Sequence, residues 1–207
     1  WQDQERYQVF NSAQGFGEAS GKFAKHHLVP FGDYVPLQEY LRGLIEFFDL
    51  PMSNASRGAR QQTNIALTLR GQDQAVEVAA GICYEIAYGD SLRRQAETSG
   101  LLLTISNDTW FGGSIGPHQH MQIAQMRALE NGRWLLRATN NGVTGIVNPR
   151  GEITAQLPQF EASVLRGDFE VMMGRTPFSK LGDIPVLFVL TVLLVVTAMR
   201  SRRTNFP

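Results

Sequence analysis

Residues 75–85 read AVEVAAGICYE and join an apolar segment directly to a cysteine-containing turn. The apolar run over 75–83 predicts a short buried strand, and residues 88–99 after it predict a helix. Residues 101–106 (LLLTIS) predict a second apolar strand. Strands that alternate with helices in this way are typical of a layered α/β fold whose central strands are buried.

The same alternation continues on both sides of this stretch. We expect further strands at 62–69, 133–139, 142–147 and 163–170, helices at 36–49 and 117–131, and a turn at 148–151 (NPRG). In the helix expected at 36–49, apolar residues recur at helical spacing between charged ones. This helix either packs on the core as an ordinary surface helix or rests its apolar face on a membrane.

Composition is that of a globular protein and excludes some functions. The 207 residues include 19 basic and 19 acidic side chains, so the formal net charge is zero, and 43% of the residues are hydrophobic. A nucleic-acid-binding protein needs a basic surface, which this balance does not provide. The length favours one large domain over two small ones. The single cysteine, Cys83, excludes an internal disulfide framework.

The most apolar part of the chain lies at 184–199 and contains no charge. Sixteen helical residues extend about 24 Å, somewhat less than a hydrocarbon core of about 30 Å. A buried core helix or strand is the alternative to a membrane span. Pro185 at the start favours the span, and Arg200, Arg202 and Arg203 at its end predict that the tail is cytoplasmic. Everything before the span is then expected on the opposite, exported face.

The chain begins at Trp1 and carries no recognisable export signal. An exported domain without such a signal is expected to be the C-terminal part of a longer protein.

Three polar motifs are candidates for a catalytic site. Cys83 follows an apolar strand and precedes a helix, which is where sites of open α/β sheets gather, and backbone N–H groups of such a turn stabilise a thiolate or an oxyanion. The alternative is an inert buried cysteine. The other motifs are KHHLVPFGDYVP at 25–36 and SNDTWFG at 106–112.

The order of these motifs, with GICYE at 81–85, resembles the nitrilase superfamily, and within it the bacterial apolipoprotein N-acyltransferases. SIGPHQH at 114–120, MRALE at 126–130 and RATNNGVT at 137–144 fit the same family. The likeness runs from about residue 11 through the apolar C-terminal segment. It implies an α/β fold of the αββα-sandwich type, here N-terminally incomplete, followed by one transmembrane helix. The expected divisions are a catalytic domain over 1–180, the helix over 181–200 and a basic cytoplasmic tail over 201–207.

The family uses a Glu–Lys–Cys triad. The resemblance places the nucleophile at Cys83 and the triad lysine at Lys25. The triad glutamate is expected upstream of this chain, because neither Glu5 nor Glu18 lies in a matching motif. A fragment without that glutamate is not expected to be active by itself.

The resemblance also assigns supporting residues. Asp33 and Glu85 match acidic positions of the family, although Asp33 is shorter than the Glu commonly found there. Tyr84 follows the nucleophile, so its backbone N–H is the expected oxyanion donor. Trp110 is expected to line the acyl pocket. A neighbouring ammonium such as Lys25 favours the thiolate form of a cysteine and can donate to the oxyanion.

The implied reaction is a two-step acyl transfer. Cys83 takes an acyl chain from a phospholipid donor as a thioester, and the N-terminal amine of a diacylated apolipoprotein acceptor then takes the chain. The expected location is the bacterial inner membrane, with the catalytic domain periplasmic. No cofactor, metal or nucleic acid is expected: His118 and His120 lack a third ligand at convincing spacing, so hydrogen bonding is the preferred role of the histidines.

Two other functions remain open. A nitrilase-type carbon–nitrogen hydrolase would use water in place of the amine, but it predicts a soluble chain. A membrane-tethered binding module that kept the fold and lost catalysis is the non-enzymatic alternative.

Overall fold

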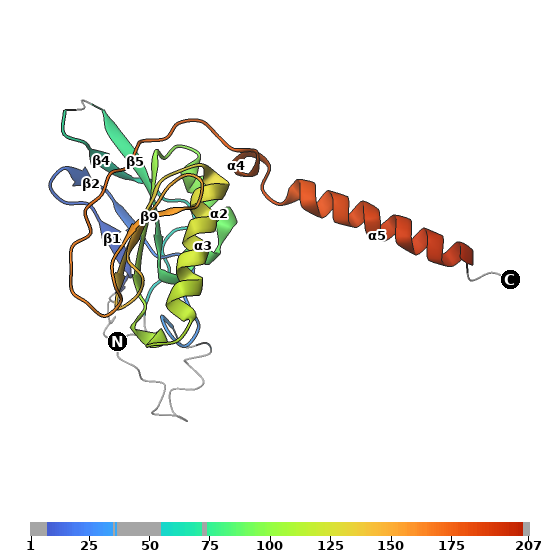
Figure 1. The fold of residues 1–207 in the computed structure, drawn as a ribbon, viewed down its shortest axis with the longest axis horizontal. Helices are drawn as coiled ribbons and strands as arrows, with labels where there is room; N and C mark the ends of the chain where they lie inside the picture. The colour runs from blue at the N-terminus through green and yellow to red at the C-terminus, as the bar shows by residue number, and fades with distance from the viewer. Residues whose placement is uncertain (1–7, 35, 37–54, 72–73, 205–207) are drawn as a thin grey trace, which may run out of the picture.

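The computed structural model describes residues 8–34, 36, 55–71 and 74–204. Its main element is a seven-stranded mixed sheet in the order β2-β4-β5-β6-β7-β8-β9, next to a two-stranded sheet of β1 and β3 (Figure 1). The strands are β1 Ser12–Gln14, β2 Ala19–Ser20, β3 Lys22–Ala24, β4 Ile65–Thr68, β5 Ala75–Ile82, β6 Leu101–Asn107, β7 Leu135–Asn140, β8 Gly145–Val147 and β9 Ile153–Gln156.

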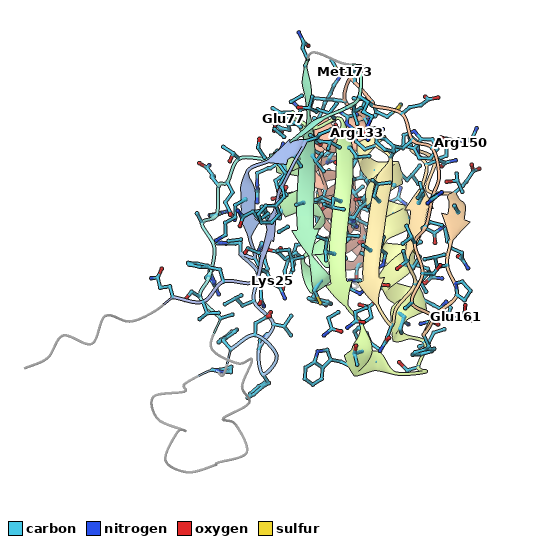
Figure 2. The ribbon with its side chains drawn as sticks, turned by 90° about the vertical axis from the view of Figure 1, so that its left-hand side faces the viewer. Lys25, Glu77, Arg133, Arg150, Glu161 and Met173 are labelled. Carbon is cyan, nitrogen blue, oxygen red and sulfur yellow. The ribbon has the colours of Figure 1, made fainter. Side chains whose placement is uncertain are left out.

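Helices and 3₁₀ turns follow the strands. They are η2 Cys83–Ala87, α2 Gly89–Ala96, η3 Thr109–Phe111, α3 Gly116–Asn131, α4 Pro177–Leu181 and α5 Ile184–Thr204. The strands β5, β6 and β7 are parallel and adjacent, whereas β4, β8 and β9 pair antiparallel. The carboxyl ends of the three parallel strands therefore lie together at one end of the sheet, which is the end labelled by Lys25 in Figure 2.

Each face of the large sheet carries its own core. On one face, α2 and α3 cover residues such as Ala79, Leu102 and Leu135 with Leu92 and Met121. These side chains are almost inaccessible, as expected for the interior of a parallel sheet.

The opposite face has a thinner cover. Phe23 of β3 and Ala13 of β1 pack against Val78 and Leu101, and Phe169 of the segment after β9 packs against the same cluster. Within the described residues, this face is thus covered by two short strands and an irregular segment.

The α/β class and most central elements are confirmed. The strands expected near 62–69, 75–83, 101–106, 133–139 and 142–147, the helices near 88–99 and 117–131, and the turn at 148–151 are all present. The helix expected at 36–49 lies outside the described residues, apart from Pro36.

The strand expected at 163–170 is wrong, because this segment contains no strand residues. Phe169 of this segment packs on the sheet, but its backbone does not join a strand. The sequence reading also missed β1, β2, β3 and β9. These strands have only two to four residues, too few for a period-two pattern to stand out.

The C-terminal helix α5 extends away from the body of the domain (Figure 1). It has 21 residues, about 32 Å of helix, of which the last five residues are polar or charged and extend beyond the 16-residue apolar part. By length and composition, its window Ile184–Ser201 is apolar enough to cross a membrane, and none of that window is buried. The alternative of a buried core helix is therefore wrong for this domain.

Candidate active site

Cys83 lies where β5 ends and η2 begins. It is half-buried, and its φ of 56° places it in the left-handed region, which residues other than glycine adopt rarely. The flanking strand and 3₁₀ turn make a sharp strand-to-helix corner, like the elbow that presents nucleophiles in other α/β enzymes. A strained cysteine at the carboxyl end of a central parallel strand is a strong candidate nucleophile.

Glu85 fastens this corner to the segment that carries Lys25. Its Oε2 accepts a hydrogen bond from the Ile82 backbone N–H at 3.0 Å. Its Oε1 accepts from the backbone N–H groups of His26 at 2.7 Å and His27 at 2.9 Å. The carboxylate is buried, and these three donors replace the water that it has lost. Glu85 thus holds the residues on both sides of the site in register.

Lys25 and Asp33 form a buried ion pair. The Lys25 ammonium lies 2.5 Å from Asp33 Oδ2, and only 2% of Lys25 is exposed. Asp33 also accepts from Asn11 Nδ2 at 2.6 Å and from the Val29 backbone N–H at 2.8 Å. The shorter side chain of Asp33 therefore does reach the lysine. A buried ammonium at this edge of the sheet has its desolvation offset by a carboxylate and is held in one position.

Aromatic side chains surround the same end of the sheet. Tyr84 is 49% exposed, and Tyr88, four residues further on, is also exposed. Trp110, in η3, is 76% exposed, and its neighbour Phe111 is exposed as well. The His27 ring stacks on Tyr88 with 4.1 Å between centroids. Trp110 lies at the expected end of the sheet, and its role in an acyl pocket stays a prediction.

A second buried network lies behind Cys83. Asp108, directly after β6, accepts from Ser106 Oγ at 2.5 Å and from Arg137 Nη2 at 2.7 Å. Its Oδ1 lies 3.0 Å from His120 Nδ1 on α3, and His120 Nε2 lies 3.2 Å from the Cys83 carbonyl oxygen. All four polar residues are buried.

The sequence reading assigned no role to Asp108 or Arg137, although both lie in the quoted motifs. The available signal was the charge of Arg137 in the middle of an otherwise apolar strand, WLLRAT. Such a charge must find a partner inside the protein. The expected hydrogen-bonding role of the histidines is confirmed for His120.

Two groups near the site have shifted pKa values. Burial, followed by the charge of His26, lowers the pKa of His27. Burial alone would raise the pKa of Asp108, but hydrogen bonds from His120 and Ser106 lower it more. The charge of Arg137 acts in the same direction, and the net pKa of Asp108 is below its usual value. Asp108 is therefore a carboxylate at neutral pH.

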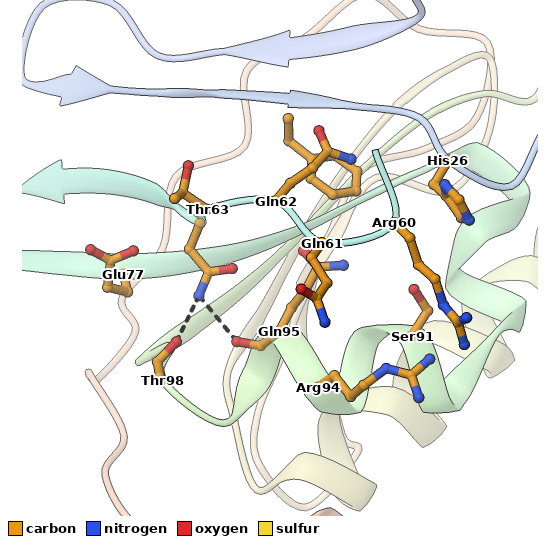
Figure 3. Close-up of a pocket in the computed structure, with 12 residues that line it drawn as sticks. His26, Arg60, Gln61, Gln62, Thr63, Glu77, Ser91, Arg94, Gln95 and Thr98 are labelled. Carbon is orange, nitrogen blue, oxygen red and sulfur yellow. Dashed lines mark hydrogen bonds between the residues drawn. The ribbon is translucent and has the colours of Figure 1, made fainter. Parts of the chain in front are cut away.

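A separate pocket lies beside the site, between residues 60–64 and α2 (Figure 3). Its volume is about 560 Å³, and all but one of its twelve lining residues are polar or charged. Asn64 spans it by donating to the Gln95 carbonyl at 3.0 Å and to Thr98 Oγ1 at 3.1 Å. Its lining includes His26 and neither Lys25 nor Cys83.

In the described part of the chain, no group of three or more His, Cys, Asp or Glu could hold a metal ion.

The comparisons with known proteins agree on one family. Residues 4–177 match the family model described as carbon-nitrogen hydrolase. Proteins named apolipoprotein N-acyltransferase are similar to nearly the whole chain. They include those of Pseudomonas paraeruginosa (50% identical over 94% of this chain and 37% of the relative), Azotobacter vinelandii (52%; 99% and 38%) and Shewanella oneidensis (48%; 90% and 35%). This chain thus spans little more than a third of the length of these relatives.

Solved structures of lower similarity also match. The C. elegans NitFhit protein aligns with 67% of this chain and 32% of its own, at 16% identity and a TM-score of 0.49. A carbon-nitrogen hydrolase from Helicobacter pylori aligns with 69% and 50%, at 16% identity and the same TM-score.

Proposed function

The chain belongs to the carbon-nitrogen hydrolase family, and we propose that it is the catalytic part of an apolipoprotein N-acyltransferase. In this proposal Cys83 is the nucleophile and Lys25 the triad lysine. Asp33, Glu85 and Tyr84 support them, and Trp110 contacts the acyl chain. Residues 1–180 form the catalytic domain, 181–200 the membrane helix and 201–207 the tail.

The exposed apolar helix α5 is the observation that favours an acyltransferase over a water-soluble hydrolase. None of its apolar window is buried in the domain, and such a surface needs an apolar environment. Exposed Tyr84, Trp110 and Phe111 around the carboxyl ends of β5 and β6 suit a lipid substrate in the same way. An enzyme whose donor and acceptor are both held in a membrane would need these features.

The first half-reaction forms a thioester. The Cys83 thiolate attacks the ester carbonyl of a phospholipid, and the Lys25 ammonium and the Tyr84 backbone N–H stabilise the resulting oxyanion. When the tetrahedral intermediate collapses, the ester C–O bond breaks. The lysophospholipid oxygen leaves and takes up the proton that a general base had removed from the Cys83 thiol.

The second half-reaction transfers the acyl chain. The N-terminal amine of a diacylated apolipoprotein attacks the thioester carbonyl, loses a proton to a general base, and the C–S bond breaks to restore the thiolate. The family triad calls for a glutamate as this base, and we place it outside this chain. The same thioester would be hydrolysed if water took the place of the amine.

The orientation of α5 is part of the proposal. In this proposal the tail with Arg200, Arg202 and Arg203 is cytoplasmic, because basic clusters beside a span tend to stay on that side, and the catalytic domain faces the periplasm at the inner membrane. The test is Ser201→Cys in a Cys83→Ser background, probed in intact cells with a membrane-impermeant maleimide. We expect labelling only after permeabilisation, and labelling of intact cells would overturn the orientation.

The activity is tested with the full-length protein that contains this chain. It is incubated with phospholipid labelled in its acyl chain and with a diacylated lipopeptide. We expect the label on the lipopeptide amine, and a rate at least ~100-fold lower for Lys25→Ala, the scale of losing one oxyanion donor. Release of labelled free fatty acid with no labelled lipopeptide would instead identify a hydrolase. A Lys25→Ala variant with near-normal turnover would remove Lys25 from the mechanism.

A further inference from the structure

His120 is placed between two hydrogen-bond acceptors. On one side its Nδ1 lies 3.0 Å from Asp108 Oδ1, and on the other its Nε2 lies 3.2 Å from the carbonyl oxygen of Cys83. Asp108 is a carboxylate at neutral pH, as argued above. A backbone carbonyl can only accept. A hydrogen bond to the Cys83 carbonyl therefore requires that His120 Nε2 carry a proton and donate it.

The two contacts of His120 are shielded from solvent. His120 is buried, and the ring of Phe111 packs edge-on against it with 6.3 Å between centroids. The Asp108 carboxylate lies between the His120 ring and the Arg137 guanidinium and contacts both. Gly142 leaves room for this carboxylate, since a Cβ there would collide with it.

The carbonyl that His120 contacts belongs to the peptide between Cys83 and Tyr84. The structure has no cis peptide bond among its described residues, and in a planar trans peptide the C=O and the N–H point in opposite directions. A hydrogen bond that fixes the Cys83 carbonyl therefore also fixes the direction of the Tyr84 N–H. That N–H lies in the first turn of η2, where no acceptor exists within the helix.

The same contact supports an unfavourable backbone. Cys83 has a φ of 56°, a conformation that costs about 1–3 kcal/mol and persists only where neighbours enforce it. The Ile82 N–H before Cys83 is held by Glu85, and the carbonyl after it is held by His120. The two hydrogen bonds clamp the corner from both sides.

We propose that His120 is a positioning residue, a buried side chain that links Asp108 to the Cys83 carbonyl and thereby aims the Tyr84 N–H at the oxyanion formed on Cys83. The inference rests on the proposed function only in taking Cys83 as the nucleophile, and it concerns any carbonyl substrate. His120 itself contacts neither substrate nor the reacting sulfur in this account.

Two reagents separate positioning from general damage in the full-length protein. A p-nitrophenyl ester acylates Cys83 through an oxyanion, whereas iodoacetamide alkylates a thiolate by displacement and forms none. Both rates are read at neutral pH, and the acylation rate is divided by the alkylation rate, which removes any change in the amount of thiolate, with Cys83→Ser as the blank. Because the ester needs neither phospholipid nor lipoprotein, failure of the proposed function would leave this test valid.

His120→Asn and His120→Gln form the matched pair. The Gln amide can place a donor near the Nε2 position, and the Asn amide reaches only the Nδ1 position. We expect His120→Asn to lower the acylation rate by about 100-fold, the scale of a misplaced or lost oxyanion donor, with alkylation changed less than about threefold. His120→Gln should recover at least about tenfold of that loss. His118→Asn, on the exposed side of α3, is the control and should match the wild type.

Three results would overturn the proposal: unchanged acylation in His120→Asn, an equal fall of acylation and alkylation, or no recovery in His120→Gln. A spectroscopic measurement on the wild type covers the case in which a variant does not fold. In protein labelled with ¹⁵N-histidine, the Nε2 of His120 should carry a proton. An unprotonated Nε2 would contradict the hydrogen bond to the Cys83 carbonyl.

Discussion

The carboxyl end of the sheet and the helix α5 depart from ordinary burial in opposite directions. At the sheet end, Lys25, Asp33 and Glu85 are charged and buried. In α5, the apolar window Ile184–Ser201 has no buried part. Charged residues are seldom fully buried without a partner, and large contiguous apolar surfaces are seldom left in water.

The two departures are resolved in different ways. Each buried charge of the site has partners inside the domain, such as Asp33 for Lys25 and three backbone N–H groups for Glu85. The apolar surface of α5 finds no cover among the described residues, so its partner must be outside the described structure. The buried charges of the site are thus compensated within the domain, whereas the apolar surface of α5 needs an apolar environment outside it.

The largest expected effect removes the partner of the buried lysine. Asp33→Asn keeps the shape of the side chain but leaves the Lys25 charge uncompensated, which should cost about 3–5 kcal/mol of unfolding free energy. The measurement is thermal and denaturant unfolding of the detergent-solubilised full-length protein. A loss below about 1 kcal/mol would show that the pair is not held in the dry environment described.

A charge introduced into α5 should affect the insertion of this helix into a membrane. Val192→Arg places a charge in the middle of the apolar window and should disfavour membrane insertion by about 2.5–3.5 kcal/mol. A glycosylation-mapping assay of insertion would then report an inserted-to-uninserted ratio lower by about 100-fold, with Val192→Leu as the unchanged control. An equal ratio for both variants would contradict a membrane environment for α5.

The pH dependence of stability gives a subtler test, using two carboxyl groups whose pKa values are shifted in opposite directions. Hydrogen bonds and Arg137 outweigh burial and lower the pKa of Asp108, whereas burial raises the pKa of Glu130. Asp108 therefore stabilises the fold above its ordinary pKa, and this contribution is lost as the pH falls through the lowered value. Glu130 destabilises the fold as the pH rises through its ordinary pKa toward the raised value.

The matched variants should consequently behave in opposite ways. At pH 7 Asp108→Asn should unfold at a lower temperature than the wild type and Glu130→Gln at a higher one. Both differences should shrink in acid, as each wild-type carboxyl becomes protonated. Two shifts of the same sign at pH 7 would contradict this electrostatic account.

The smallest effect is expected at the surface. Asp90 pairs with Arg93 and Arg94 on α2, but its side chain is about half exposed. Exposed pairs contribute about 0.2–1 kcal/mol, so Asp90→Asn should change stability by less than about 1 kcal/mol. A change as large as that of Asp33→Asn would remove the distinction between buried and exposed pairs.

Local patterns in the sequence were enough to predict the centre of this fold. The apolar runs of β5 and β6 and the amphipathic α2 between them are continuous in sequence, so their periodicity is visible. The motifs around Cys83, Lys25 and Asp33 were also identified from the sequence, because each is a compact string of residues.

Contacts between distant segments could not be predicted in the same way. Asp108, His120 and Arg137 lie on β6–η3, α3 and β7, and only the parallel register brings them behind Cys83. The error at 163–170 has a related cause, since an apolar side chain such as Phe169 can pack on the sheet whether or not its backbone pairs with a strand. Only the position of a segment in the folded protein distinguishes a paired strand from an irregular segment that packs on the sheet, because the sequence pattern alone does not separate them.

The central claim is that Cys83 carries the acyl group, and trapping that intermediate tests it most directly. Full-length protein is incubated with phospholipid labelled in its acyl chain, without acceptor, and then treated with neutral hydroxylamine, which cleaves thioesters. The account predicts label on the wild type that hydroxylamine releases, and none on Cys83→Ser. Equal label on both proteins, or label that resists hydroxylamine, would contradict it.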